Sequence, residues 1–431
     1  MDNKYWRPLS FADSNSMCAN RGDEVWLYDT NGNKFFDGYS GLWNVNLGYS
    51  NQAVKSAITQ QLDELPYSNP LFFSNKIAEK LAIKLCSMIN MDMTKVIFAC
   101  SGSETIEVAI KLVRKYSNLR CKKANLIAVF GNSYHGSYYG SMSASTFEGN
   151  RREGYTPLLD GFVSIGIPYM RCKQSDINDD YAVTLIDQLE KTLSNYAGQI
   201  CALLIEPIIG SGGVIMPPLK YMNYLQEFCT RNDVLLICDE IACGFGRSGE
   251  MFGFQNYKLR PDIVTLSKGI NNGYLPAGAV CVNSRIVNCF QENEQLLFHL
   301  STQNANPICM ASCFATIEQY TDTLLENIKE MGSFWRNCLN TLLEFQCVFD
   351  IRVFGLMVAI DLIDINNDAP LSNLELNHII EICCRRGVIV GDSFVENVLS
   401  AILLFPPYCT TKSQIRNAVS IIRQSLIEYM S

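Results

Sequence analysis

The stretch VLLICDEIACGFGRSGEMFGFQNYKLRPDIVTLSKGINNGYLPAGAVCVN, residues 234–283, decides the fold of this chain. It opens with the apolar run Val234 to Cys238, which predicts a buried strand that ends at Asp239. A second apolar run leads to Lys268, which is followed at once by a glycine. An ammonium group loses hydration where a buried strand meets a glycine turn, so we expect the protein to use Lys268 or to pair it.

Two interpretations of Lys268 follow from these residues. Desolvation lowers the pKa of a lysine, and the neutral amine is a nucleophile that forms a Schiff base with an aldehyde such as pyridoxal phosphate (PLP). That cofactor needs a carboxylate to keep its pyridine nitrogen protonated, and Asp239 is the candidate. Ligands gather outside the carboxyl ends of parallel strands, where both residues would lie. The alternative is an ordinary ion pair between Lys268 and Asp239.

The composition describes a large chain with a mixed surface. It has 431 residues, 48% of them apolar and 18% charged, so it can bury a large core and is predicted to form two or three domains. The net charge of -8 is spread without long charge blocks, which argues against nucleic acid as a partner. No hydrophobic run could span a bilayer and the N-terminus has no secretory pattern, so we expect a soluble, cytoplasmic protein without a membrane partner.

The eighteen cysteines are irregularly spaced, and several, such as Cys238 and Cys281, lie inside apolar runs. They could form a metal site or a disulfide framework, or they could be reduced, buried, small hydrophobic residues. The chain has only three histidines and is too large to need crosslinks. The second interpretation is therefore favoured, and no metal is predicted.

From about residue 67 to residue 306, short apolar runs alternate with helical stretches, which is typical of a mainly parallel sheet with helices on both faces. The expected strands are Lys95 to Ala99, Asn125 to Phe130, Cys201 to Ile205, Val234 to Cys238, Ile263 to Leu266 and Ala277 to Val282. Before them we expect a hairpin, EVWLYD and KFFDGYS around a TNGN turn, and then a helix from Asn51 to Leu65. After residue 307, the strand-like FGLMVAIDL and LSAILLF among helical runs predict an α+β region.

Two other strand ends carry groups suited to an anion and to an aromatic ring. The run KVIFA leads into a helix opened by Ser101, Gly102 and Ser103, and a helix N-terminus favours an anion. Either serine could instead be a plain N-cap. The run NLIAVF leads to YHG, where Tyr134 could cover one face of a pyridine ring, while His135 could be a satisfied structural polar group.

Together, DEIACGFGRSG, PDIVTLSKGINNGYLPAGAV, SGSETIEVAIKLVR and YHG resemble the class III (omega) aminotransferases, PLP-dependent enzymes of fold-type I, and the similarity runs from about Trp6 to the C-terminus. The resemblance implies a large domain with a mainly parallel seven-stranded sheet and a small α+β domain. Residues 1–60 would form an N-terminal segment that belongs to the small domain, residues 61–310 the large PLP-binding domain, and residues 311–431 the C-terminal small domain.

The resemblance also implies which residues bind the cofactor: Ser101, Gly102, Ser103, Tyr134, His135, Glu206, Asp239, Lys268 and Thr302. Lys268 and Asp239 would be catalytic, and Glu206 would lie near the 3-hydroxyl group of the cofactor. Thr302, in HLSTQNANP, would reach the phosphate of the neighbouring subunit, which implies a homodimer with shared active sites. A helix cap is the alternative role for Thr302.

For the substrate, the resemblance implies that Trp43 is a wall of the pocket, although a core tryptophan is the alternative. Many relatives bind a substrate carboxylate with an arginine shortly before a PP(L/Y) motif, yet no arginine lies between residues 386 and 416 before or around FPPY. Either Arg151, Arg152 or Arg247 holds the carboxylate, or the substrate has none near the cofactor.

The predicted function is transfer of an amino group between a primary, terminal amine and an aldehyde or keto acceptor, by a ping-pong mechanism with a lysine Schiff base. A biosynthetic role suits the missing arginine. Relatives that act on ornithine or 4-aminobutyrate carry a second glutamate at the position of Ser211, so the chain resembles the broader omega-amine branch. The alternative is a PLP-dependent amino-acid racemase or aminomutase with the same lysine and aspartate. A non-catalytic PLP-binding module is disfavoured because the cofactor residues are present.

Overall fold

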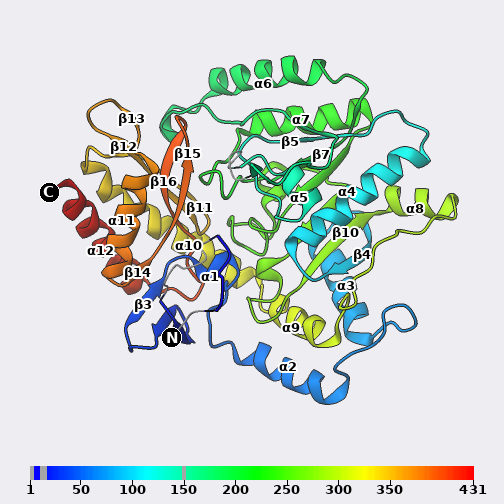
Figure 1. Ribbon diagram of the computed structural model, residues 1–431, viewed down its shortest axis with the longest axis horizontal. Coiled ribbons are helices and arrows are strands. Elements are labelled where there is room, and N and C mark those ends of the chain that lie inside the picture. The colour runs from blue at the N-terminus through cyan, green and yellow to red at the C-terminus, as the bar shows by residue number, and fades with distance from the viewer. Residues whose placement is uncertain (1–3, 10–16, 148–151) are drawn as a thin grey trace.

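The protein is described by a computed structural model over residues 4–9, 17–147 and 152–431, and three sheets lie within these residues. The largest sheet has seven strands in the order β4-β10-β9-β8-β7-β5-β6, with helices on both of its faces (Figure 1). Its strands are β4 (Met93–Ala99), β5 (Leu126–Val129), β6 (Phe162–Ser164), β7 (Ile200–Ile205), β8 (Leu235–Asp239), β9 (Ile263–Leu266) and β10 (Gly278–Asn283). From β6 to β9 all neighbours are parallel, and only β10 runs antiparallel to both of its neighbours. The predicted mainly parallel, seven-stranded sheet is thus confirmed.

The central strands form because their sequences are apolar on both faces. Every residue of β7 (ICALLI), β8 (LLICD) and β9 (IVTL) is buried, as expected for parallel strands that are covered by helices on both sides. The six strands expected from the apolar runs all exist, with ends shifted by one or two residues. Strand β6 was not predicted, because FVS is only three residues long and none of them is fully buried.

Helices cover the large sheet and turn the chain back between its strands. They are α3 (Lys76–Ile89), α4 (Gly102–Leu119), α5 (Tyr139–Ala144), α6 (Asp179–Ser194), α7 (Leu219–Asn232), α8 (Ser284–Glu292) and α9 (Pro307–Ile317), with short 3-10 turns η2 (Gln174–Asp176), η3 (Gly253–Tyr257) and η4 (Lys268–Ile270). Figure 1 shows α6 and α7 together along the upper edge, while α4 packs against β9 and β10. The buried stripe of α4, which includes Val108, Leu112 and Val113, explains why this helix lies flat on the sheet.

The N-terminal segment forms a small sheet that the C-terminal part of the chain completes. The predicted hairpin is present as β2 (Trp26–Asp29) and β3 (Lys34–Asp37), and an unpredicted strand, β1 (Ala19–Asp23), pairs with β2. On its other side β3 pairs in parallel with β14 (Val388–Ile389). The chain continues through α1 (Ser40–Trp43) and α2 (Gln52–Glu64). This pairing joins both ends of the chain, while the division at residues 60 and 310 stays a prediction.

The C-terminal region is α+β, as predicted. Its elements are α10 (Asp322–Leu339), η5 (Asn340–Glu344), β11 (Val348–Phe354), β12 (Met357–Asp364), β13 (Ala369–Pro370), α11 (Asn373–Arg385), β15 (Gly391–Val395), β16 (Leu399–Leu404) and α12 (Lys412–Met430). The strands β11-β12-β16-β15 form one sheet, with β13 beside β12. The single strand expected at FGLMVAIDL was wrong at its start: Gly355 has φ +55° and makes the turn of a β11–β12 hairpin.

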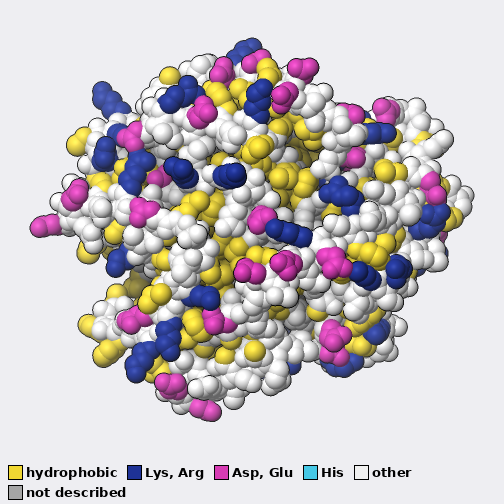
Figure 2. Space-filling model, turned by 180° about the vertical axis from the view of Figure 1, so that it is seen from behind, with side chains coloured by type: hydrophobic (Ala, Val, Ile, Leu, Met, Phe, Trp, Pro, Cys, Tyr) yellow, Lys and Arg dark blue, Asp and Glu magenta, His cyan; other side chains and the backbone are white. Residues whose placement is uncertain are grey.

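The surface mixes the two signs of charge. Figure 2 shows Lys and Arg side chains interspersed with Asp and Glu side chains over one face of the molecule, between patches of apolar side chains. No helix in the described part of the chain is long and apolar enough to cross a membrane. The eighteen cysteines are free thiols, many of them buried.

Candidate active site

Four parallel strands deliver the predicted site residues to one edge of the large sheet. Strand β7 ends just before Glu206, β8 ends at Asp239, and β9 ends two residues before Lys268. Because β7, β8 and β9 are neighbours and run in the same direction, these side chains meet outside the carboxyl ends of the strands. The turn after β5 adds Tyr134 and His135 at the same edge.

Lys268 stands in a left-handed turn beside an aromatic ring. Its φ is +45°, an uncommon conformation for a residue other than glycine, and such conformations collect at functional sites. Its Nζ lies 4.3 Å from the centroid of the Trp43 ring. Burial lowers the pKa of Lys268, against the opposing effect of the Glu206 and Asp239 carboxylates. Lys268 therefore gives up its proton at a lower pH than a free lysine does.

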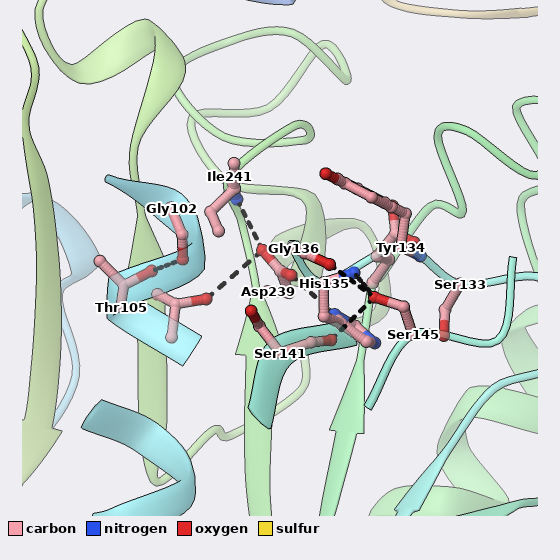
Figure 3. Close-up of polar contacts among 12 residues, drawn as sticks. Gly102, Thr105, Ser133, Tyr134, His135, Gly136, Ser141, Ser145, Asp239 and Ile241 are labelled. Carbon is pink, nitrogen blue, oxygen red and sulfur yellow. Dashed lines mark hydrogen bonds and ion pairs between the residues drawn. The ribbon is translucent and has the colours of Figure 1, made fainter. Parts of the chain in front are cut away.

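Asp239 is a buried carboxylate that its neighbours hold in one orientation. Its Oδ2 lies 2.8 Å from Nδ1 of His135, which is itself almost fully buried, and Figure 3 shows the two side chains facing each other. Its Oδ1 accepts hydrogen bonds from the backbone N–H of Ile241, at 3.0 Å, and from Oγ1 of Thr265, at 3.4 Å. No ion pair joins Asp239 to Lys268 among the described residues, so the simple strand-end ion pair is not what the structure contains.

His135 is fixed from its own backbone as well. Its N–H donates to Oγ of Ser145, at 2.8 Å, and Ser145 Oγ in turn donates to the carbonyl of Ser141 (Figure 3). Since a carboxylate only accepts, the Nδ1 of His135 carries the proton in its contact with Asp239. A histidine held in this way orients the carboxylate, while the role of His135 toward the cofactor stays a prediction.

Glu206 joins two turns of the site. Its Oε1 accepts the backbone N–H of Tyr134, at 2.9 Å, and its Oε2 accepts the backbone N–H of Gly210, at 3.0 Å. Burial raises the pKa of Glu206 to about 7, and the Asp239 charge adds to this, whereas His135 and the two N–H groups oppose it. The side chain of Tyr134 is 43% exposed, so its ring is open to a ligand.

The raised pKa of Glu206 predicts a pH-dependent stability. A carboxyl group whose pKa is higher in the folded protein stabilises the fold below its unfolded pKa, near 4.5, and loses this contribution as pH rises to about 7. The glutamine of Glu206→Gln stays neutral at every pH, so this variant lacks the loss. Between pH 5 and pH 8 we expect its unfolding free energy to fall by on the order of 2 to 3 kcal/mol less than that of the unmodified protein. Urea unfolding of both proteins at the two pH values measures the difference, and parallel pH profiles would contradict the assignment.

The phosphate candidates lie at the N-terminus of α4. Ser101 is the N-cap and its Oγ accepts the N–H of Glu104, at 3.1 Å, so its hydroxyl already has the plain capping role. Oγ of Ser103 accepts the N–H of Ser137, at 3.1 Å, which ties the helix start to the turn that follows His135. Gly102 has no side chain that could shield the N–H groups of the helix start. A larger residue would be crowded there, because a Cβ would lie 3.0 Å from Cδ1 of Ile241. The helix end can therefore receive an anion.

Trp43 is both a buried residue and a wall beside Lys268. Its ring stacks on Phe405 with centroids 4.1 Å apart and an angle of 13° between the planes. Opposite, Gly210 leaves room for the ring, because a Cβ at Gly210 would lie 2.9 Å from Cζ3 of Trp43. The role of Trp43 toward a substrate stays a prediction; its contact with Lys268 places it where that role requires.

The loop that carries Trp43 is fastened to the loop that follows Lys268. Asn272, almost fully buried, accepts the N–H of Leu47 through Oδ1, at 2.7 Å, and donates from Nδ2 to the carbonyl of Gly48, at 2.8 Å. These two loops are more than 200 residues apart in the sequence. The sequence analysis did not predict roles for Asn272, Phe405 and Thr265. Only Thr265 could have been noticed, as a polar residue inside an apolar run that forms a fully buried strand.

Arg247 is held by other parts of the protein, although its Nε has no hydrogen-bond partner among the described residues. Arg247 is fully buried and donates to the carbonyl of Pro406, at 2.7 Å, and to Oδ1 of Asn46, at 2.6 Å. Its guanidinium also lies over the Tyr408 ring, at 4.7 Å from the centroid. Arg247 thus fastens the loop after β8 to the C-terminal region, and its binding of substrate stays a prediction. Arg151 lies outside the described residues.

Thr302 follows Ser301, whose Oγ lies 3.4 Å from Sγ of Cys100, just before the N-terminus of α4. It is exposed, and its carbonyl accepts a hydrogen bond from the hydroxyl of Tyr67, at 3.0 Å. The alternative that Thr302 caps a helix is wrong, because α9 begins at Pro307 and its N-cap is Asn306. Its role toward a neighbouring subunit stays a prediction.

These groups fit pyridoxal phosphate. A partly buried lysine with a lowered pKa suits the aldehyde, an oriented carboxylate suits a protonated pyridine nitrogen, and the α4 N-terminus suits the phosphate. All three lie at the carboxyl edge of one mainly parallel sheet. Together the fold and the site define a PLP-dependent enzyme of fold-type I.

Comparison with known proteins narrows this class to one family. The sequence profile of the family described as "Aminotransferase class-III" matches residues 10–426. An uncharacterized aminotransferase of Bacillus subtilis, YhxA, is 33% identical, over 97% of this chain and 94% of the relative. The putrescine–pyruvate aminotransferase of Pseudomonas aeruginosa is 30% identical, over 94% of this chain and 89% of the relative. The crystal structure of a PLP-bound amine transaminase from an uncultivated Pseudomonas species has a TM-score of 0.92 and 31% identity, and 99% of each chain is covered.

The chain belongs to the class III aminotransferases, and its cofactor is pyridoxal phosphate. The resemblance drawn from the motifs is confirmed, as is the prediction of a PLP-dependent aminotransferase. The racemase or aminomutase alternative is not favoured, because the matching family and the relatives named above are aminotransferases.

Proposed function

We propose that the protein transfers the amino group of a primary, terminal amine to an aldehyde or keto acceptor, in two half-reactions at one site. The observation that carries this proposal is the partly buried Lys268 amine, with its lowered pKa, at the same sheet edge as the oriented Asp239 carboxylate. The relatives support the substrate class, since one is named for putrescine and pyruvate and a similar structure is that of an amine transaminase.

Each site residue then has a distinct task. When bound, pyridoxal phosphate supplies an aldehyde for the amino group and a ring that accepts electrons from the donor carbon. Lys268 would hold this aldehyde between turnovers, and once the donor amine has taken its place the freed, neutral Nζ would take the proton from the donor carbon. Asp239 keeps a proton on the pyridine nitrogen, and His135 holds Asp239 in place for this. Gly102 and Ser103 bind the phosphate through the α4 N-terminus.

Around the reacting carbon the described residues offer aromatic surface rather than a free guanidinium. The stacked rings of Trp43 and Phe405 form one wall, and the Nη atoms of Arg247 donate to Pro406 and Asn46. Because both Nη atoms already donate within the protein and only Nε lacks a partner, Arg247 does not offer two free nitrogens to a carboxylate for bidentate binding. We therefore infer that the donor needs no carboxylate next to the carbon that bears its amine.

We also propose a homodimer with shared active sites, in which Thr302 reaches the phosphate site of the neighbouring subunit. The support is a group of exposed apolar side chains in the segments that precede Thr302 and follow its hydrogen-bond partner Tyr67. Its members are Leu71, Phe72, Phe73, Leu296, Phe298 and Leu300, each more than half exposed in the single chain. Exposed apolar side chains of this kind usually mark a protein–protein contact.

We further propose that the protein is a cytoplasmic, biosynthetic enzyme. Its eighteen free cysteines suit a reducing compartment.

A single-turnover experiment tests the proposed function. We expect the PLP-loaded protein, mixed with excess 1,4-diaminobutane or 2-phenylethylamine and no acceptor, to release one carbonyl product per active site and then stop. Addition of pyruvate should restart product release, because a ping-pong enzyme needs the acceptor to recover its first form. Chromatography of the products measures the stoichiometry. Entry of solvent deuterium into the donor without any carbonyl product would contradict the proposal and favour an isomerase.

A further inference from the structure

The turn that leads from β3 to Trp43 is organised by one buried carboxylate. Asp37, the last residue of β3, is 1% exposed. Its Oδ1 accepts the backbone N–H of Tyr39, at 3.1 Å. Its Oδ2 accepts the backbone N–H of Gly41, at 2.6 Å, and the hydroxyl of Tyr49, at 2.5 Å. Two backbone donors and one phenol therefore depend on a single side chain that lies outside the cofactor cluster.

The backbone that Asp37 holds is in an unfavourable conformation. Ser40 has φ +49°, Gly41 has φ +65° and Trp43 has φ +62°, so α1 is not a regular helix but a turn with left-handed residues at both ends. A left-handed conformation costs free energy for serine and tryptophan, and it persists only where the surroundings impose it. Besides Asp37, the turn is held by Ser40, whose Oγ donates to the carbonyl of Phe405, at 2.5 Å.

The turn places Trp43 against the site. The Trp43 ring lies between Phe405 and Gly210, with Nζ of Lys268 at 4.3 Å from its centroid. If the turn relaxed to ordinary backbone angles, the ring would leave this position, because the direction of Cβ follows φ and ψ. The strain thus serves the placement of one aromatic side chain beside the reactive lysine.

We propose that Asp37 is a positioning residue for the substrate pocket: it holds the turn of residues 38–43 in its strained form and so sets how far the Trp43 ring extends toward Lys268. This inference rests on the proposed function, since it takes Trp43 to limit the space that is open to the amine donor. Asp37 does not touch the reacting atoms. It acts through Trp43.

Asp37→Asn tests this with little change of shape. An asparagine has one carbonyl oxygen and one NH₂ group, so it cannot accept from both backbone N–H groups and Tyr49 as the carboxylate does. We expect hydrogen exchange of the amides of Trp43, Asn44 and Val45 in the PLP-loaded protein to become about tenfold faster. We also expect KM for 2-phenylethylamine to change by about tenfold while KM for a short alkylamine changes little, because only the larger donor reaches the Trp43 ring.

Two further variants separate positioning from general stability. Asp29→Asn is the matched control, because Asp29 also accepts hydrogen bonds from a turn, that of Asn31 and Asn33, but in the hairpin of the same small sheet. It should lower the melting temperature without changing the KM ratio of the two donors. Tyr49→Phe removes one of the three bonds to Asp37, should act in the same direction as Asp37→Asn to a smaller degree, and serves if Asp37→Asn does not fold.

The decisive comparison is made in a Trp43→Ala background. If Asp37 acts through Trp43, Asp37→Asn should have no further effect on the KM ratio once the ring is gone. An effect that is equally large with and without the ring would overturn the proposal. The proposal would also be overturned if the amides of residues 43–45 exchanged as slowly in Asp37→Asn and in Tyr49→Phe as they do in Asp29→Asn. The exchange measurement needs no amine donor, so it remains decisive even if the proposed aminotransfer fails.

Discussion

Lys268→Ala is expected to lower the rate of amino-group transfer by at least about 10⁴-fold, the largest effect of any single substitution outside the core. The variant loses the nucleophile that holds the cofactor and the base that takes the donor proton, and each role alone contributes several orders of magnitude. Folding should survive, because alanine removes a partly buried amine whose burial already disfavours its charged form. The measurement is the single-turnover rate of carbonyl formation with 2-phenylethylamine.

Lys258→Ala is the matched control for this prediction. Lys258 also has a left-handed backbone, with φ +55° against +45° at Lys268, so both substitutions place alanine in the same unfavourable conformation. Lys258 is exposed and caps the turn η3. Its replacement should leave the rate within about twofold, as is usual for a surface substitution. A Lys268→Ala protein with more than a hundredth of the unmodified rate would refute the assignment of Lys268.

Asp239→Asn is expected to lower the rate by about 10²- to 10³-fold while the cofactor still binds. An asparagine oxygen can accept the hydrogen bond from Nδ1 of His135, so the local geometry is retained. The charge that keeps the pyridine nitrogen protonated is lost, and with it the ability of the ring to accept electrons from the donor carbon. Measurements of kcat and of cofactor affinity separate the two effects: we expect the larger loss in kcat.

Asp262→Asn provides the corresponding control at the opposite edge of the sheet. Asp262 is buried just before β9 and accepts the N–H of Leu236, at 2.9 Å, and Nδ2 of Asn283, at 2.8 Å. Burial raises its pKa, as expected for a carboxyl group that serves the fold. Its substitution should lower the melting temperature but leave kcat unchanged. Equal losses of kcat in both variants would show that Asp239 matters only for stability.

The large sheet was predictable because buried parallel strands have a recognisable sequence pattern. Strands such as β7 and β8 are short apolar runs, and the polar residues directly after them, Glu206 and Asp239, mark the edge at which ligands bind. Short or exposed strands carry no such pattern, so β1 and β6 were missed. The turn at Gly355 was also missed, since a glycine between two apolar runs is equally compatible with one continuous strand.

The sequence pointed to the candidate site residues that follow strands, but not to the residues that hold the surrounding loops in place. Lys268 and Asp239 follow from their places at the ends of apolar runs, whereas the contacts of Ser40, Asn272 and Phe405 join segments that are far apart in the chain. Arg247 shows the limit most clearly. An arginine is suited to bind a carboxylate, but Nη1 of Arg247 donates a hydrogen bond to the carbonyl of Pro406, 159 residues away. The role of Thr302 toward a neighbouring subunit stays a prediction, because the structure describes a single chain.

The most direct test of the account is to reduce the PLP-loaded protein with borohydride and to locate the attached cofactor by peptide mass spectrometry. Reduction makes permanent the bond between the cofactor and the amine that holds it. The account predicts one phosphopyridoxyl group per chain, on the peptide that contains Lys268, and none on the Lys268→Ala protein. A modified lysine elsewhere, or no specific attachment in the unmodified protein, would contradict it.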